Sequence, residues 1–415
     1  MIFKTLLAGV VALSAHATTP LVFPPLDIHK LHQKELANEK LGEAPRFAVV
    51  RNVSVKPQSF EERDGLLVWK QRVRALNAVS LNFAFEKFKL TPNARLSIYA
   101  TDFSVSVRDF TAEDNNIHGE LWSPVILAED VTIELSIPES ELDELELELT
   151  RVNQGFRTFS QTTEKAGSCN VDVVCEEGDE WQKEINSVGV ISTGGSTFCT
   201  GFMVNNTSND RTPLFMTAAH CRVREYNAAS LVVYWNYQSQ QCGGSRNGNL
   251  DQFNTGSQFL AASAKSDFAL VKLLNNPEPE WNVTYAGFDA RDLDTSSATA
   301  IHHPATDEKS ISFEFDPTTT TSYLKDKVPG DSTHIRVENW DVGTTEPGSS
   351  GSPLFNAEKR VIGQLHGGYA SCRSATPDWY GRIHTSWEGE GVPEKRLVDW
   401  LDPGKTGDLI TDTIE

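Results

Sequence analysis

The chain has 415 residues, of which 39% are hydrophobic, and its formal net charge is -20 with an isoelectric point near 5.0. This length predicts two or three domain-sized units, and the hydrophobic content is sufficient for folded cores. A chain this acidic would repel nucleic-acid phosphates and anionic membrane surfaces, and no basic stripe offsets the repulsion, so neither is an expected partner.

The first 17 residues have the parts of a secretory signal peptide. Lys4 supplies a positive start, residues 6–13 are an apolar run, and the tripeptide A-H-A at 15–17 is a cleavage site of the A-x-A type. The apolar run is well short of the ~20 residues that a spanning helix needs, so a membrane anchor is the weaker interpretation. We therefore expect a secreted chain that begins near Thr18, in a periplasm or outside the cell.

Residues 18–150 show the alternation of apolar and polar residues that is typical of half-buried strands. The pattern is clearest in LNFAFEKFKL (81–90), RLSIYATDFSV (95–105) and VTIELSIP (131–138), and a very acidic version follows at 142–150. This part is predicted to be a small β-rich unit. The polar stretch RTFSQTTEKAGS (157–168) then predicts an exposed linker.

From Cys169 onward, short apolar runs recur between turn residues, which predicts an all-β barrel or sandwich. The runs are SVGVIS, FCTGFMV, LFMTAAH, SLVVYW, DFALVKL, ATAIHH and RVIGQLHG. Only PEKRLVDWL (393–401), near the end, has its apolar residues on one helical face.

All six cysteines lie between Cys169 and Cys372, and the part before them has none. In an exported protein an even count predicts three disulfides, and six cysteines allow about 15 pairings. A zinc site is disfavoured because there is no C-x-x-C and the spacings are wide. We expect no metal and no cofactor.

Three local patterns could together form a nucleophilic site. His220 ends the apolar stretch LFMTAAH, Asp267 opens the strand DFALVKL, and Ser350 lies in GSSGSP. A serine hydroxyl needs a base, and the base needs a carboxylate to orient it. Alone, each residue is more often structural, but their order is that of chymotrypsin, and GSSGSP matches G-x-S-G-[GS]-P. In that register the amides of Gly348 and Ser350 form the oxyanion hole.

These motifs resemble the trypsin-like serine proteases, and more closely the bacterial lysyl endopeptidases. The closer similarity is carried by SCNVDVVC (168–175), LVVYWNYQ (231–238), AIHHP (300–304), TEPGSSGSP (345–353), KRVIGQLHGG (359–368) and WLDP (400–403). It covers roughly residues 166–415, whereas the first 165 residues match only in role.

The resemblance implies an all-β protease domain at 166–415, built from two antiparallel Greek-key β-barrels of six strands with a short C-terminal helix. A signal peptide at 1–17 and a β-rich propeptide at 18–165 would precede it. The active site would lie between the barrels, with no cofactor. The implied disulfides are Cys169–Cys372, Cys175–Cys242 and Cys199–Cys221.

The resemblance also implies a specificity for lysine. Trypsin's pocket aspartate lies six residues before the nucleophile, where this chain has Thr344. Lysyl endopeptidases instead use a later aspartate, which matches Asp378 and would favour a compact ammonium. His366 and Gly367 would also contact the substrate or the triad, and Tyr323 stands where the family has a covering tryptophan. The alternatives are cleavage after both lysine and arginine, or after glutamate.

Activation by trypsin's route is not expected, because Ser349 replaces the aspartate that pairs with the new N-terminus. The resemblance predicts removal of the propeptide, with self-cleavage after Lys165 leaving Ala166 as the mature N-terminus, or with Arg157 as a second candidate. The propeptide would act as a partner, either an inhibitor or a folding aid. The expected enzyme is a monomer that acts on peptides.

Two other classes of function are disfavoured. A catalytically inactive binding module would usually lack a triad residue, and this chain keeps all three. A metalloenzyme using His302 and His303 is unfavourable because adjacent residues of a strand point to opposite faces.

Overall fold

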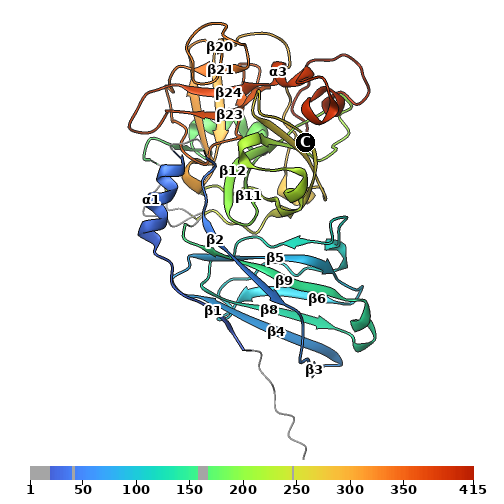
Figure 1. Cartoon of the computed structure of the whole chain (residues 1–415). Helices are drawn as coiled ribbons and strands as arrows, with labels where there is room; N and C mark the ends of the chain where they lie inside the picture. The colour runs from blue at the N-terminus through green and yellow to red at the C-terminus, as the bar shows by residue number, and fades with distance from the viewer. Residues whose placement is uncertain (1–18, 40–42, 158–166, 245–246) are drawn as a thin grey trace, which may run out of the picture.

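The computed structural model describes residues 19–39, 43–157, 167–244 and 247–415. The described residues form two stacked parts, a smaller one before residue 157 and a larger one after residue 167 (Figure 1). The expected signal peptide, and Lys165 and Ala166 of the linker, lie outside the described residues.

The smaller part is a pair of sheets packed over one core, which confirms the β-rich prediction. One sheet has the order β1-β4-β8-β6 with β3 on β4, and β1 is parallel to β4. The other has the order β2-β9-β5-β7. The strands are β1 (Leu21–Phe23), β2 (Ala48–Val55), β3 (Glu61–Arg63), β4 (Leu66–Ala75), β5 (Ser80–Lys89), β6 (Arg95–Ala100), β7 (Leu121–Trp122), β8 (Asp130–Ile137) and β9 (Glu146–Gly155).

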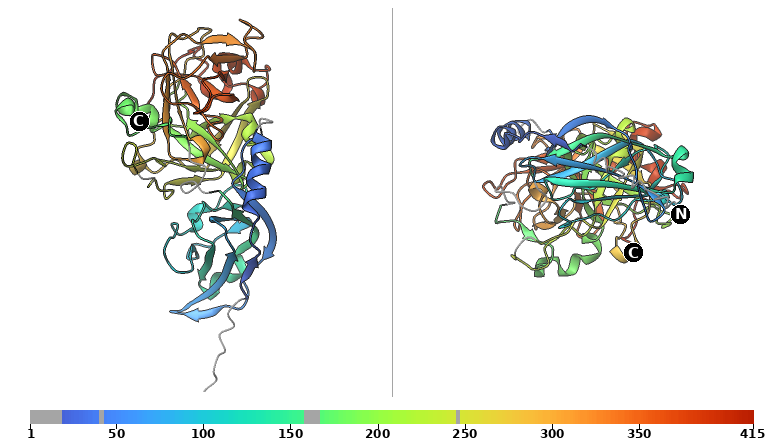
Figure 2. Two further views of the ribbon diagram at one scale, coloured as in Figure 1. Left: turned by 90° about the vertical axis from the view of Figure 1, so that its left-hand side faces the viewer. Right: turned by 90° about the horizontal axis from the view of Figure 1, so that it is seen from below.

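One helix of this part, α1 (Ile28–Glu39), was not predicted from the sequence. It extends along the side of the larger part, away from the two sheets (Figures 1 and 2). Its Glu35 is fully buried and accepts hydrogen bonds from Arg46, 3.1 Å from Nε to Oε1. A helix that buries a carboxylate in place of an apolar stripe has a weak hydrophobic pattern, so its sequence carries little helical signal.

The first barrel of the larger part closes through one bent strand. Its sheet has the order β15-β14-β11-β12-β13-β17-β16, and only Gly256, at φ +82°, separates β15 from β16. Because β15 pairs with β14 and β16 pairs with β17, the two pieces act as the sixth strand of a closed barrel. The strands are β11 (Val188–Thr193), β12 (Thr197–Met203), β13 (Leu214–Ala218), β14 (Val232–Tyr234), β15 (Phe253–Thr255), β16 (Ser257–Ser263) and β17 (Phe268–Leu273).

The second barrel has the order β19-β18-β22-β23-β24-β21, with β10 and β20 added at the edges. It closes because Phe313 of β19 exchanges backbone hydrogen bonds with Val342, which follows β21, at 2.9 and 3.2 Å. The prediction of two antiparallel β-barrels is therefore confirmed. The strands are β10 (Val171–Asp172), β18 (Ala298–His302), β19 (Ser310–Glu314), β20 (Thr319–Thr321), β21 (His334–Val337), β22 (Pro353–Phe355), β23 (Val361–Gly368) and β24 (Asp378–Arg382).

Short helices complete the larger part, and one hydrophobic cluster joins both barrels to the helices near the C-terminus. The segment predicted to be helical divides into a 3-10 turn and α4, so that helix is shorter than expected. The α-helices are α2 (Gln182–Ile185), α3 (Ile383–Glu388) and α4 (Val398–Leu401). The 3-10 helices are η1 (Ala112–Asp114), η2 (Glu139–Glu144), η3 (Glu176–Trp181), η4 (Ala219–Cys221), η5 (Glu225–Ser230), η6 (Pro279–Trp281), η7 (Pro304–Thr306) and η8 (Pro393–Lys395).

A short strand contact joins the two parts at β12. The Phe198 amide donates to the Pro45 carbonyl at 3.0 Å, and the Phe47 amide donates to Ser196 at 2.8 Å. Arg46 and Thr197 form the bridge between these two bonds. Residues 45–47 thus add to β12 as an antiparallel strand.

The three disulfides implied by the resemblance are all present, joining Cys169 to Cys372, Cys175 to Cys242 and Cys199 to Cys221. Each lies within the larger part. Among the residues described, none of the helices has the length and apolar character needed to cross a membrane.

Candidate active site

Strand register brings His220 and Asp267 together. Ala218 at the end of β13 pairs with Phe268 at the start of β17, so the residues just beyond both ends are neighbours. His220 Nδ1 lies 2.7 Å from Asp267 Oδ2, and the His220 amide donates to Oδ1 at 3.0 Å. Asp267 is buried and has φ of +56°, an uncommon conformation for a residue other than glycine. The carboxylate therefore fixes both the backbone and the ring of His220.

The loop that carries Ser350 is tied to the first barrel. Thr200 of β12 donates from its amide to the Ser350 carbonyl at 2.9 Å, and from its hydroxyl to the Gly348 carbonyl at 2.9 Å. The Ser350 carbonyl oxygen also lies 3.8 Å from the sulfur of Cys221, the residue after His220. Among the described hydrogen bonds none joins the Ser350 hydroxyl to His220, which is common before a substrate binds.

Gly348 is a position where only glycine fits. Its φ is +103°, and a Cβ built there would lie 2.4 Å from a ring carbon of Phe198. Real Cβ atoms do not come that close, and the φ value disfavours an L-residue in any case. The loop can therefore bring the Gly348 amide close to the nucleophile only because this residue has no side chain.

Ser349, next to the nucleophile, is held by a buried histidine. Its hydroxyl lies 2.8 Å from His302 Nδ1, and His302 Nε2 lies 3.0 Å from the Ser312 hydroxyl. Burial lowers the pKa of His302 to about 3, so this contact is between neutral groups. The loop is thus braced by a neutral hydrogen bond where trypsin uses an ion pair.

A second brace involves Glu346 in the same loop. Its Oε2 accepts from the Gly167 amide at 2.9 Å and from the Asn170 side chain at 3.0 Å. The carboxylate therefore connects the nucleophile loop to the beginning of the described protease segment.

Asp378 begins β24 and is 1% exposed. Its Oδ2 accepts from Trp340 Nε1 at 2.8 Å and from the Thr345 hydroxyl at 2.6 Å. Burial raises the pKa of Asp378 above its ordinary value, while these two hydrogen bonds oppose that rise. Since Thr345 is five residues before Ser350, the carboxylate lies directly behind the nucleophile loop. Thr344, in trypsin's aspartate position, is buried and neutral.

His366 lies on β23, and its Nε2 is 3.6 Å from Asp267 Oδ2. Burial lowers the pKa of His366 to about 4. Tyr323 covers it, with ring centroids 3.6 Å apart and an interplanar angle of 4°. Gly367 follows, and a Cβ there would come within 3.3 Å of the Tyr323 hydroxyl. The tyrosine thus takes the covering position that the sequence left in doubt.

Sequence reasoning missed three residues of this region: His334, Trp340 and Thr345. His334 Nε2 lies 2.9 Å from His366 Nδ1, because β21 reaches β23 through β24. Its local sequence THIRV resembles any half-buried strand, so only the strand order could have identified it.

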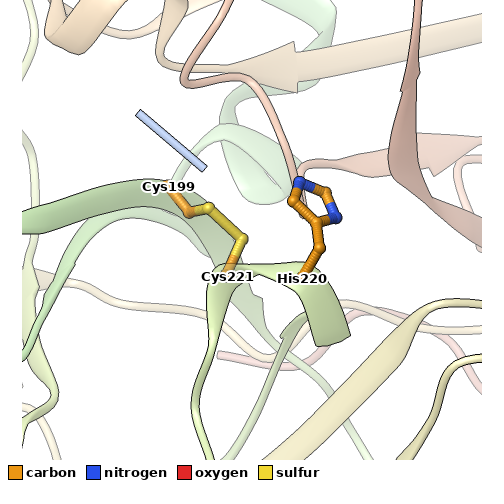
Figure 3. A group of neighbouring side chains, drawn as sticks. All are labelled: Cys199, His220 and Cys221. Atoms are coloured by element: carbon orange, nitrogen blue, oxygen red, sulfur yellow. A yellow bond between two sulfur atoms is a disulfide. The ribbon is translucent and has the colours of Figure 1, made fainter. Parts of the chain in front are cut away.

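Two groups of side chains have metal-ligand spacing, but the structure explains both in other ways. Cys199 and Cys221 are joined in a disulfide beside His220, so neither offers a thiolate (Figure 3). The other group is His220, Asp267 and His366, which belongs to the site described above. As expected, His302 and His303 have separate partners, and His303 Nδ1 lies 3.0 Å from the Asp307 carbonyl.

Comparisons with known proteins agree with this arrangement. The family model described as lysyl endopeptidase, C-terminal domain, matches residues 163–381. A lysyl endopeptidase of Pseudomonas aeruginosa is 29% identical over 292 residues, which are 64% of this chain and 61% of that protein. The match therefore spans less than two thirds of the length of that relative.

Solved structures of proteases also match, at low identity. The active form of the Rv3671c protease from M. tuberculosis is 17% identical, with a TM-score of 0.33, over 55% of this chain and 88% of that one. Deg5 is 15% identical, with a TM-score of 0.33, over 55% of this chain and 99% of that one. The family model covers more than half of the chain, and by that match the protein belongs to the lysyl endopeptidase family of serine endopeptidases.

Proposed function

We propose that this protein is a secreted endopeptidase that cleaves peptide bonds on the carboxyl side of lysine. The observation that carries the proposal is the meeting of His220, Asp267 and the Ser350 loop at the seam of two barrels, with Asp378 behind that loop. The proposed enzyme is a monomer made as a pre-pro-protein, with residues 1–17 as signal peptide and 18–165 as propeptide.

In the proposed mechanism His220 Nε2 accepts the proton of the Ser350 hydroxyl as the oxygen attacks the scissile carbonyl. Asp267, held to Nδ1, keeps the ring in the tautomer with Nε2 free and stabilises the imidazolium that forms. The proton then passes to the leaving amine, which departs and leaves an acyl-enzyme. Water, activated by the same histidine, hydrolyses the acyl-enzyme and regenerates Ser350.

The oxyanion that forms during attack would accept hydrogen bonds from the amides of Gly348 and Ser350. The braces from His302 to Ser349 and from Glu346 to Gly167 support this role. They hold the loop without an aspartate next to the nucleophile, so its donors are pre-positioned. Removing one such donor in other enzymes costs about 10²- to 10³-fold in rate.

The preference for lysine rests on Asp378. A buried carboxylate can pair with a buried ammonium, whereas a substrate glutamate would be repelled there. Its Oδ2 is already bonded to Trp340 and Thr345, so the guanidinium of arginine would find no carboxylate edge with both oxygens free. Cleavage after both lysine and arginine remains the alternative, and cleavage after glutamate is less compatible with this carboxylate.

The contact at β12 supports the propeptide as a partner of the protease. Residues 45–47 pair with 196–198, and Phe198 packs close to Gly348 in the nucleophile loop. Glu43 pairs with Arg222, two residues beyond His220. A segment of the N-terminal part, blue as in Figure 1, also passes beside Cys199 (Figure 3). In this position the propeptide would obstruct the approach of a substrate, which favours the inhibitory role.

Digestion of an unrelated denatured protein, followed by mass spectrometry of the new C-termini, tests the proposed specificity. We expect lysine at essentially every new C-terminus. A mixture of lysine and arginine would replace the proposal with the broader alternative, and glutamate would contradict it. Failure to cleave, together with failure to react with a serine-directed phosphonate, would favour an inactive binding protein.

A further inference from the structure

A chain of hydrogen-bonding groups runs from the surface to the catalytic aspartate. The exposed Asp331 Oδ1 lies 2.7 Å from the Thr333 hydroxyl, and that hydroxyl lies 2.7 Å from His334 Nδ1. His334 Nε2 then lies 2.9 Å from His366 Nδ1, whose Nε2 faces Asp267 at 3.6 Å. The proposed mechanism uses none of the first three residues, although His334 is 1% exposed.

The direction of each bond follows from counting protons. Although burial alone would raise it, hydrogen bonds from Thr333 and Ser322 hold the pKa of Asp331 below its ordinary value, so this carboxylate only accepts. Burial lowers the pKa of His334 to about 3 and that of His366 to about 4, so each ring carries one N–H. With the one hydroxyl of Thr333, three protons are available for four contacts.

These three protons have one arrangement that satisfies the short contacts. Thr333 must donate to Asp331, so His334 Nδ1–H donates to Thr333 and His334 Nε2 is left as an acceptor. His366 Nδ1–H then donates to His334. The lone pair of His366 Nε2 therefore faces Asp267, and that contact of 3.6 Å is the one too long for a hydrogen bond.

We propose that Asp331, Thr333 and His334 are positioning residues, which hold His366 in the Nδ1–H tautomer so that the Asp267 carboxylate serves His220 alone. In the other tautomer, His366 Nε2–H would donate to the oxygen that His220 uses. The proposal rests on the catalytic role proposed for His220 and Asp267. Other groups facing this pair of rings are the Tyr323 hydroxyl, whose pKa burial raises to about 12, and His220 itself.

Thr333→Val and Asp331→Asn reverse this order of donors. Valine accepts no hydrogen bond, so the His334 proton moves to Nε2, donates to His366 Nδ1 and forces the His366 proton to Nε2. Asparagine can donate to Thr333 and produces the same reversal from the surface, where misfolding is less of a concern. Asp326→Asn is the matched control, because Asp326 is an exposed aspartate in the same connection.

The experiment records 15N spectra of the histidine rings in protein made from the full chain, without substrate, and assigns His366 by comparison with His366→Gln. We expect a protonated Nδ1 in the wild-type protein and in Asp326→Asn, and a protonated Nε2 in Thr333→Val and Asp331→Asn. Steady-state kinetics should show kcat for lysyl substrates lowered about tenfold in the two reversed variants, with KM unchanged.

A wild-type His366 protonated at Nε2 would overturn the proposal. So would a tautomer that neither variant changes, or one that changes while kcat does not. Because the tautomer is measured without substrate, a failure of the lysine assignment would leave this test intact.

Discussion

The carboxylate of Asp378 is a single residue on which the choice of substrate depends. Two neutral donors hold it in a buried place, so it is preorganised for a cation that it cannot replace with water. In Asp378→Asn we expect kcat/KM for lysyl substrates to fall about a hundredfold or more, since an unpaired buried charge costs ~3 kcal/mol. Reaction with an uncharged serine-directed phosphonate, measured in parallel, should be nearly unchanged. Equal losses in both assays would contradict the pocket role.

The raised pKa of Asp378 predicts how lysine recognition depends on pH. Burial makes this carboxyl take up a proton at higher pH than an aspartate with the ordinary value of 3.8. The anionic form that pairs with lysine is therefore lost as the pH falls, earlier than for an exposed carboxylate. KM for lysyl peptides should rise on acidification while the phosphonate reaction lacks that step. A KM independent of pH on the acid side would argue against this assignment.

At this scale the sequence predicts residues that local motifs mark, and misses those that only register brings in. TAAHC, SDFALVKL and GSSGSP identify His220, Asp267 and Ser350 because each lies beside a turn that its neighbours dictate. The partners of Asp378 and His366 lie on other strands of the second barrel. No local pattern can name Trp340 or His334, because cross-strand neighbours depend on strand order.

The nucleophile loop is the element whose backbone shape the proposed chemistry most requires. Gly348→Ala would place a Cβ against Phe198 and force the loop to move, displacing an oxyanion donor. We expect kcat to fall about a hundredfold, with a smaller change in KM. Gly391→Ala is the matched control, because Gly391 also has positive φ but nothing within 4 Å of its Cβ position. Similar losses in both variants would show that the backbone strain, not the displacement, is responsible.

The strands themselves were largely predictable, because buried apolar runs and turn residues set their limits. The run DFALVKL, for example, corresponds to β17 with its aspartate just outside. The bend at Gly256 was not predicted, because closing a barrel is a property of six strands together. The helix α1 was missed for a different reason: its burial depends on the ion pair of Glu35 with Arg46, 11 residues away in the sequence.

For the whole molecule, maturation can be tested through the nucleophile. If the protein processes itself, Ser350→Ala expressed as the full chain should accumulate as the unprocessed form, while the wild-type chain is shortened. The measurement is the intact mass of the purified protein. Efficient maturation of the variant in a host without other suitable proteases would refute self-processing.

The association of the two parts can be tested through Arg46. In Arg46→Ala, Glu35 would remain buried without its partner, which costs ~3 kcal/mol and weakens the strand at β12. We expect the processed propeptide to separate from the protease on size-exclusion chromatography, where the unsubstituted pair co-elutes. Arg95→Ala, which removes an exposed ion pair with Asp109, should leave co-elution unchanged. Co-elution of the Arg46 variant would show that the strand contact is not needed.

The placement of the disulfides has a consequence for how long inhibition would last. All three lie between Cys169 and Cys372, so after cleavage in the linker no covalent bond connects the protease to the segment that covers β12. The fraction of inhibited enzyme then obeys a dissociation constant and depends on concentration. The proposed enzyme would remain silent where it is crowded, near the cell that makes it, and become active as it diffuses away. Dilution would itself be the signal that releases it.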